Sequence, residues 1–237
     1  PHHRIYAIGD VHGRRDLLDV MLRRLEDDAD RHADSRQPVI LFLEDLVDRG
    51  DQTCGTLDLA IAAVLTWPRV VCLRGNHEAA LLSFLETPES GAAWLEFGGR
   101  QTLASYKVPM SATKPDPEEL HRAAAALDAA MAHHRHFLSE SLRLFRSGNV
   151  VFAHAGIDPA APLEDQSDAA VLWGRSSFLE DGPPDGLRVV HGHWPGVAPV
   201  VTPRRVCLDT GAYYTGQLTA ARFDADTALI SVDGLDV

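Results

Sequence analysis

The stretch IYAIGDVHG, residues 5–13, sets the pattern for the first third of the chain. Its apolar run, residues 5–8, predicts a short buried strand that ends at Gly9, just before Asp10 and His12. The same order of apolar run, turn and polar residues recurs at 39–50 and 70–78. Between these runs, apolar residues recur with helical spacing at 17–32, 56–65 and 78–86, which predicts three helices. Asp16 is the expected N-cap of the first. Buried strands that alternate with helices predict an α/β fold with a largely parallel sheet covered by helices.

The rest of the chain divides into a helical part and a strand-rich part. Residues 92–145 have helical spacing, including HFLSESLRLF at 136–145, and we expect a helical insertion at about 87–147. Further strands are expected at 150–153, 188–190, 206–208, 218–223 and 229–232. The alternation in the last two predicts that they pair antiparallel. With 237 residues, the chain is expected to form a single domain, 1–237.

Composition excludes several classes of protein. The 22 Lys and Arg residues against 34 Asp and Glu residues give a formal charge of −12, which argues against a general nucleic-acid or membrane-surface binder. No apolar run approaches the ~20 residues that span a bilayer. The three cysteines, Cys54, Cys72 and Cys207, are widely spaced and form no CxxC pair. We therefore expect reduced thiols in a cytoplasmic protein that makes no membrane contact.

Residues whose side chains can bind a metal ion follow five of the expected strands. They are Asp10 and His12, then Asp45 and Asp48, then Asn76 and His77, then His154, and finally His193. Because the carboxyl ends of strands in an open α/β sheet meet at one crevice, we expect these residues to lie close together. Carboxylate and amide oxygens with neutral imidazoles suit Mn²⁺, Fe or Zn²⁺. A carboxylate can bridge two ions ~3.5–4 Å apart, as in phosphoryl-transfer sites, and Asp45 is the better bridge because potential ligands flank it on both sides.

The motifs GDVHG, DLVDRG, RGNHE, HAG and GHW occur in this order between residues 9 and 194. They resemble the calcineurin-like metallophosphoesterases, and most of all the phosphoprotein phosphatase group in its bacterial serine/threonine phosphatase and diadenosine tetraphosphatase-like branch. The resemblance implies a four-layer α+β sandwich in which helices flank central mixed sheets. It also implies a site for two transition metal ions, Mn foremost, with Fe or Zn as alternatives.

The resemblance assigns a role to each matching residue. Asp10, His12 and Asp45 would hold one metal, and Asp45, Asn76, His154 and His193 the other, with a hydroxide between the ions as nucleophile. His77 would be the acid that protonates the leaving group, and Asp48 would orient it. Arg49, Arg74 and Arg175 would bind the phosphate oxygens, although a structural ion pair is an equal alternative for Arg175.

A few residues depart from the pattern or remain open. Glu44 stands where the family usually has glycine, and strand alternation would point its side chain away from that of Asp45. His191 shares a face with His193, but a structural role is favoured for it. The run His133, His134 and His136 is expected at a solvated helix junction, and Glu78 is expected to be a simple helix-start residue.

Three functions follow from these motifs. The first is a metal-dependent phosphatase acting on phosphomonoesters such as phosphoserine, phosphothreonine or phosphotyrosine in proteins. The second is a hydrolase of dinucleoside polyphosphates such as diadenosine tetraphosphate, or of other nucleotides. The third, suggested by Glu44, is an inactive binding domain. The partner expected for the first two is a phosphorylated protein or a small phosphoester.

Overall fold

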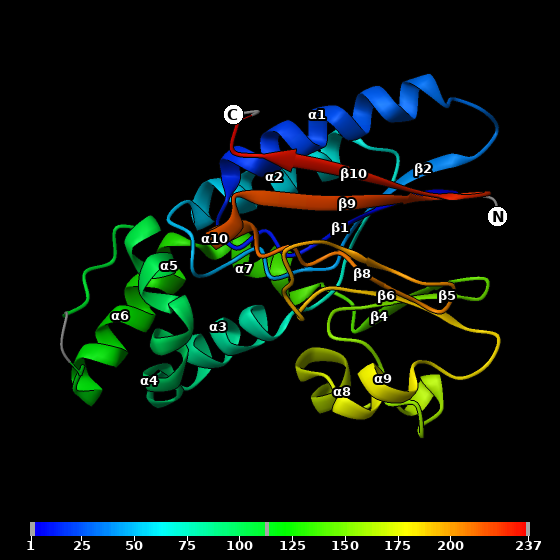
Figure 1. Ribbon diagram of the computed structural model, residues 1–237. Helices are drawn as coiled ribbons and strands as arrows, with labels where there is room; N and C mark the ends of the chain where they lie inside the picture. The colour runs from blue at the N-terminus through cyan, green and yellow to red at the C-terminus, as the bar shows by residue number, and fades with distance from the viewer. Residues whose placement is uncertain (1–2, 112–113, 236–237) are drawn as a thin grey trace.

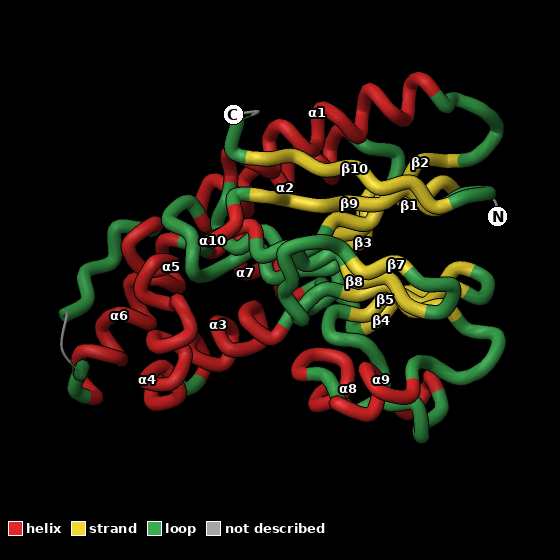
Figure 2. The backbone as a smooth tube through the Cα atoms, viewed as in Figure 1, coloured by secondary structure: helices red, strands yellow, loops and turns green. Residues whose placement is uncertain are grey.

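The computed structural model describes residues 3–111 and 114–235 and contains two five-stranded sheets (Figures 1 and 2). The ends of the expected single domain and residues 112–113 of the expected helical insertion lie outside the described residues. The first sheet has the order β10 (Thr227–Asp233), β9 (Gln217–Phe223), β1 (His3–Ile8), β2 (Gln37–Phe42) and β3 (Val70–Cys72). The second has the order β4 (Leu144–Ser147), β5 (Val150–Ala153), β6 (Arg188–His191), β8 (Arg205–Cys207) and β7 (Val200–Val201).

Both sheets are mixed. Strands β1, β2 and β3 run parallel, as do β5, β6 and β8. The antiparallel pairs are β1 with β9, β9 with β10, β4 with β5, and β7 with β8. The predicted antiparallel pairing of the last two strands is therefore confirmed. Because the central strands of each sheet are parallel, their carboxyl-terminal ends lie at one edge, and the polar motifs are found there.

The strand β1 is buried on both faces, which explains its continuous apolar sequence. Ile5 and Ala7 point toward the second sheet and pack in an apolar layer with Phe152 and Val206. Tyr6 and Ile8 point the other way, into a core shared with the helices. The two sheets thus pack face to face through side chains of alternate residues.

Helices cover the outer faces of both sheets. The helices α1 (Arg15–Arg31) and α2 (Thr53–Thr66) lie on the first sheet, and α8 (Asp168–Trp173) and α9 (Ser176–Asp181) lie on the second (Figure 1). The result is a helix–sheet–sheet–helix arrangement, and the predicted α/β sandwich of mixed sheets flanked by helices is confirmed. Helix α1 begins two residues earlier than expected, because its N-cap is Arg14. Asp16 lies in the first turn, where its carboxylate accepts a 2.8 Å hydrogen bond from Arg14 Nε.

A group of helices lies beside the sheets at the edge where the polar motifs stand (Figure 1). Its members are α3 (Asn76–Glu86), α4 (Gly91–Trp94), α5 (Arg100–Ser105), α6 (Pro117–Ala130), α7 (Ala132–Ser139), a 3₁₀ turn at Pro88–Ser90 and a π turn at Leu95–Gly99. The chain also has two short elements, a 3₁₀ turn at Leu163–Asp165 and α10 (Ala212–Thr215), the second of which lies at this same edge (Figure 1). No helix of the described ranges 3–111 and 114–235 has both the length and the apolar character needed to cross a bilayer.

The helical prediction for residues 136–145 is wrong beyond Ser139. Helix α7 ends there, and Leu144–Ser147 forms the edge strand β4, paired antiparallel with β5. The ring centroids of Phe145 and Phe152, which oppose each other in that pair, are 6.1 Å apart. Short apolar runs fit either period, and here a cross-strand partner far along the chain decides the outcome.

The layer between the sheets predicts a clear stability difference between two leucines. Leu41 of β2 is fully buried in that layer, whereas Leu229 of β10 is 46% exposed. Leu41→Ala should lower the free energy of unfolding by about 2–5 kcal/mol, because it leaves a cavity between close-packed sheets. The matched variant Leu229→Ala should cost less than about 1 kcal/mol. Urea denaturation followed by circular dichroism measures both, and equal losses would contradict this account of the core.

Candidate metal centre

The carboxyl-terminal strand ends bring the expected polar residues together. Asp10 and His12 follow β1, and Asp45 follows β2. Asn76 and His77 open α3 directly after β3, while His154 follows β5 and His193 follows β6. The first five come from the first sheet and its connections, and the last two histidines come from the second sheet. All of them except His193 are at least nine-tenths buried.

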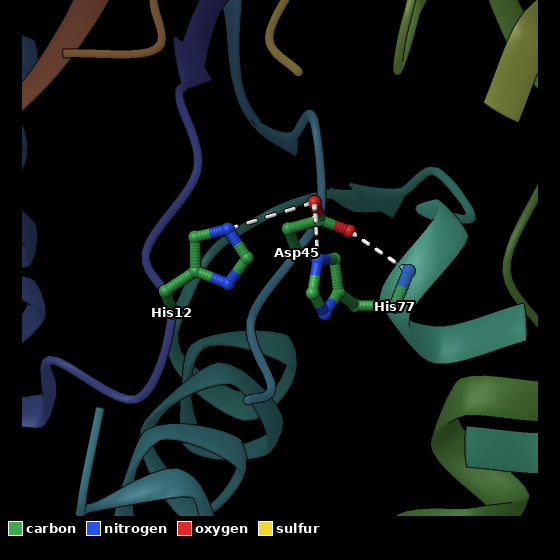
Figure 3. A group of neighbouring side chains, drawn as sticks. All are labelled: His12, Asp45 and His77. Carbon is green, nitrogen blue, oxygen red and sulfur yellow. Dashed lines mark hydrogen bonds and ion pairs between the residues drawn. The ribbon is translucent and has the colours of Figure 1, made fainter. Parts of the chain in front are cut away.

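Asp45 lies at the centre of this cluster (Figure 3). Its Oδ2 is 3.7 Å from His12 Nε2, 4.0 Å from His77 Nε2 and 3.4 Å from His154 Nε2. Its Oδ1 accepts a 3.2 Å hydrogen bond from the backbone N–H of His77. Although burial acts to raise it, the pKa of Asp45 lies well below its ordinary value because the surrounding histidines, His154 foremost, favour the carboxylate.

Two sets of potential ligands share Asp45. The side chains of His12, Asp45 and His77 form one group, and those of Asp45, His154 and His193 form the other, with ligand atoms within 4.8 Å of one another in each. Asn76 belongs with the second group, since its Oδ1 is 2.9 Å from both His154 Nε2 and His193 Nδ1. A carboxylate flanked by two imidazole groups is the arrangement expected of a ligand that bridges two ions.

Asp10 stands at the edge of the first group. Its Oδ2 accepts a 3.0 Å hydrogen bond from the backbone N–H of His193, whereas its Oδ1 is buried without a hydrogen-bond partner among the described residues. Burial and then the charge of Asp209 raise the pKa of Asp10 well above its ordinary value. A buried carboxylate oxygen with no donor is the kind of atom that a cation would satisfy.

Backbone carbonyls fix the orientation of two histidines. His12 Nδ1–H donates to the Val47 carbonyl at 2.9 Å, and His154 Nδ1–H donates to the Leu43 carbonyl at 3.0 Å. Both rings consequently turn Nε2 toward Asp45. Burial lowers the pKa of His12 to about 3, so its ring is neutral at pH 7, as a metal ligand must be.

His77 and Asp48 form a buried pair. His77 Nδ1 is 2.8 Å from Asp48 Oδ2, and Asp48 also accepts bonds from Trp94 Nε1 at 2.8 Å and from the Thr102 hydroxyl at 2.6 Å. Burial lowers the pKa of His77, but the charges of Asp45 and Asp48 outweigh it, so that the pKa is raised overall. The pair therefore favours a protonated imidazole held in a fixed orientation.

The three expected phosphate ligands lie in different surroundings. Arg49 reaches the cluster, with its Nη1 2.9 Å from His12 Nε2 and its guanidinium 5.0 Å from the ring centroid of Tyr213. Arg74 instead donates to the Ser139 carbonyl and to the Ser141 hydroxyl. Arg175 is half-exposed, and its Nε is 3.8 Å from Asp158 Oδ2. Of the three, Arg49 is the one whose contacts join it to the metal-competent side chains.

Left-handed backbone is concentrated in this cluster. Among the described residues, seven non-glycine residues have φ between 47° and 84°, and six of them are His12, Glu44, Asp45, Asp48, Arg49 and His193. The seventh is Lys107. Such a conformation costs about 1 kcal/mol or more per residue and persists where the surrounding contacts hold it. The chain is therefore bent tightly to point these side chains into one small volume.

The expectation for Glu44 rests on strand alternation, which does not apply here. The strand β2 ends at Phe42, and Glu44 and Asp45 both have positive φ. The Glu44 side chain is buried, and neither of its carboxylate oxygens has a hydrogen-bond partner among the described residues. Burial, and then the charges of Glu78 and Asp45, raise its pKa well above the ordinary value.

Sequence reasoning missed two buried carboxylates. Glu78 was expected only to begin a helix, but its Oε1 accepts the Leu46 N–H at 2.9 Å and its Oε2 accepts the Asp45 N–H at 3.2 Å. It therefore holds the bend that carries Asp45. Asp209 follows β8 just as Asp10 follows β1, so the strand-end pattern could have revealed it. Its Oδ1 accepts the Gly211 N–H at 2.9 Å.

The structure also shows the surroundings of His191 and of the histidine run at 133–136. His191 is fully buried, donates from Nδ1 to the Gly192 carbonyl at 2.9 Å and packs on Phe178 at 5.2 Å, as the structural reading expects. The helix junction with His133 and His136 is only partly solvated, because His134 between them is fully buried.

Comparison with known proteins agrees with the motifs and the geometry. The sequence profile described as calcineurin-like phosphoesterase matches residues 3–229. The chain belongs to this family. As a family member with relatives named as phosphatases and nucleotide hydrolases, it is a phosphoric ester hydrolase.

Relatives of two names cover nearly the whole chain. Bis(5'-nucleosyl)-tetraphosphatase PrpE of Oceanobacillus iheyensis is 26% identical over 93% of this chain and 88% of its own length. Serine/threonine-protein phosphatase 1 of Salmonella typhimurium is 27% identical over 92% of this chain and 91% of its own length. A candidate diadenosine tetraphosphatase of known structure shares the fold, with a TM-score of 0.64, 21% identity and coverage of 98% and 94%.

Replacing Glu44 by glycine should stabilise the metal-free protein. Glycine tolerates φ of 84° and removes a buried carboxylate that has no donor, so we expect a gain of about 1–2 kcal/mol, or about 2–6 °C in Tm. Because the folded-state pKa of Glu44 is raised, its destabilising effect appears above its unfolded pKa and grows as the pH rises. The gain should thus be larger at about pH 7.5 than at about pH 5.5.

The matched variant is Glu44→Gln, which removes the charge but keeps the left-handed backbone strain. Glu44→Gln should recover the part of the stability gain that depends on pH, but a smaller share of the part that does not. Differential scanning calorimetry of apoprotein at the two pH values measures all three proteins. A lower Tm for Glu44→Gly would show that the buried carboxylate is favourably bound in a way that its contacts do not reveal.

Proposed function

We propose that this hydrolase acts on phosphomonoesters at the cluster around Asp45, with two transition metal ions held there. The observation that carries the proposal is the sharing of Asp45 between two groups of imidazoles, in each of which a backbone carbonyl orients one ring, that of His12 or that of His154. The unpartnered Oδ1 of Asp10 supports it, since a cation would satisfy that atom. Nitrogen and oxygen donors without thiolates fit Mn²⁺, Fe or Zn²⁺, with Mn the expected ion.

His12 and Asp45 would contact one ion, and Asp45, Asn76, His154 and His193 the other. Asp10 and His77 are alternative further ligands of the first, because His77 Nε2 is 4.0 Å from Asp45 Oδ2 and Asp10 supplies a free oxygen nearby. When bound, the ions would supply Lewis acidity and lower the pKa of water toward neutrality. The resemblance favours Asp10 as the ligand and leaves His77 free for proton transfer.

His77 would protonate the departing alkoxide or phenoxide. Its Nδ1–H is held by Asp48, so the proton to be transferred is on Nε2, the nitrogen that faces Asp45. Asp48 orients the ring and stabilises its positive charge, while Thr102 and Trp94 hold Asp48 in place. The raised pKa of His77 keeps the acid form available near neutral pH.

Arg49 would bind the non-bridging phosphate oxygens. Its guanidinium lies against His12 on one side and over Tyr213 on the other, which holds the planar group beside the cluster. Arg74 and Arg175 would take part only after leaving their present partners, Ser139 and Ser141 for Arg74 and Asp158 for Arg175.

Two substrate classes fit this centre. The DRG and GNHE motifs and the serine/threonine phosphatase relative support phosphoproteins. A cavity of about 390 Å³ next to Arg49, lined in part by Phe97, Arg100 and Tyr213, supports a dinucleoside polyphosphate as the second candidate, because exposed aromatic rings can stack on a base. The relatives named PrpE agree with that candidate.

His77→Asn should retain its metal but lose turnover in a way that depends on the leaving group. With phosphoserine, whose alkoxide needs a proton, kcat should fall by about 10²–10⁴-fold. With p-nitrophenyl phosphate, whose phenoxide leaves without a proton, the loss should be much smaller. Steady-state kinetics and inductively coupled plasma mass spectrometry measure turnover and metal content. Loss of an ion from the variant would instead make His77 a ligand.

Substrate preference can be measured directly. Wild-type protein loaded with Mn²⁺ should hydrolyse a phosphopeptide with a higher kcat/KM than diadenosine tetraphosphate, and the chelated protein should hydrolyse neither. Phe97→Ala, at the exposed rim of the cavity beside Arg49, should leave phosphopeptide hydrolysis within about twofold of wild type. A preference of about a hundredfold for the dinucleotide, lost in Phe97→Ala, would reverse the order of the two candidates.

A further inference from the structure

A second histidine cluster lies outside the centre at Asp45. Its members are Asp58 of α2 and the consecutive residues His133 and His134 of α7, whose ligand atoms all lie within 4.8 Å of one another. His134 Nε2 is 3.1 Å and His133 Nε2 is 3.8 Å from the same atom, Asp58 Oδ1. The helices α2 and α7 pack against each other, so the cluster joins two segments far apart in the chain.

The geometry is unusual for side chains that merely pair with a carboxylate. Consecutive residues on a helix point about 100° apart, yet these two rings lie together, with centroids 3.9 Å apart, and both aim Nε2 at one oxygen. The ligands of a tetrahedral Zn²⁺ with bonds of about 2.0–2.2 Å are about 3.3–3.6 Å from one another. The two observed distances, 3.1 and 3.8 Å, lie on either side of that range.

The surroundings of His134 match those of a metal-binding imidazole. The ring is fully buried, and burial followed by the neighbouring His133 lowers its pKa. Without an ion, His134 Nε2 is hydrogen-bonded to Asp58 Oδ1 at 3.1 Å. The second nitrogen, Nδ1, is 2.5 Å from the hydroxyl oxygen of Tyr106, which can accept Nδ1–H when Nε2 turns its lone pair to a cation. His133 and Asp58 are 66% and 60% exposed, so ions and water reach the cluster from solvent.

We propose that Asp58, His133 and His134 form an accessory metal site for a borderline divalent cation such as Zn²⁺, with water as the fourth ligand. Two imidazoles and one carboxylate favour Zn²⁺ over Mg²⁺ or Ca²⁺, which prefer oxygen ligands. The ion joins α7 to α2. Because Tyr106 directly follows α5 and Ser139 ends α7, it also stiffens the segments that carry Thr102 and the carbonyl acceptor of Arg74.

Zinc stoichiometry in matched variants tests this site independently of turnover. His133→Ala removes an exposed ligand and should leave the fold intact. The control is His121→Ala, an exposed histidine whose Nε2 is likewise paired with a carboxylate, Glu89, at 2.9 Å. Within the described residues, His121 belongs to no group of three metal-competent side chains. Each protein is equilibrated with Zn²⁺, dialysed, and analysed by inductively coupled plasma mass spectrometry and by thermal unfolding.

Wild type and His121→Ala should each retain about one equivalent of zinc more than His133→Ala. Zinc should raise their Tm by a margin that His133→Ala and the second variant, Asp58→Ala, both lack. The centre at Asp45 is the same in all four proteins, so it cancels in the difference. Equal zinc content and equal Tm shifts in all four would overturn the proposal and leave His134 as a buried structural histidine.

Discussion

The Asp45 carboxylate is the group on which the centre depends, and it is surrounded by an excess of buried negative charge. Asp10, Glu44, Glu78 and Asp209 all lie near it, each is at least nine-tenths buried, and the pKa of each is raised, foremost by burial. Packing so many carboxyl groups together without water is costly unless cations or protons offset their charge. In the metal-free protein, bound protons and the neighbouring histidines offset part of this negative charge. Metal ions held at the proposed site would take up the remaining charge.

Much of the centre follows from one rule, that parallel strands deliver their carboxyl ends to a common edge. That rule predicted the meeting of Asp10, Asp45, Asn76, His154 and His193 from five separate segments. The rule also applies to Asp209. The strand before it, residues 206–208, was predicted, but Asp209 was not recognised as the polar residue at its end. Thr102 and Trp94, which hold Asp48, carried no such signal, because they come from helices whose placement depends on tertiary packing.

The remaining misses have local physical causes. Leu144–Ser147 fits both helical and strand periods, and only its pairing with β5 decides between them. His134 is buried because α2 and α5 pack against each other beside it, a contact between segments that sequence spacing alone does not reveal.

The candidate metal ligands come from both sheets, and this has a consequence for how the protein responds to strain. Asp45 and Asn76 follow strands of the first sheet, while His154 and His193 follow strands of the second. Apolar side chains such as those of Ala7, Leu41 and Phe152 pack between the sheets, and near the centre a hydrogen bond from His154 Nδ1–H to the Leu43 carbonyl also joins the two. A small sliding of one layer over the other would separate the two halves of the ligand set while every strand kept its own hydrogen bonds. Metal affinity should therefore respond to a shift between the two sheets before secondary structure does. We expect metal affinity to be lost first when heat or pressure loosens the interior.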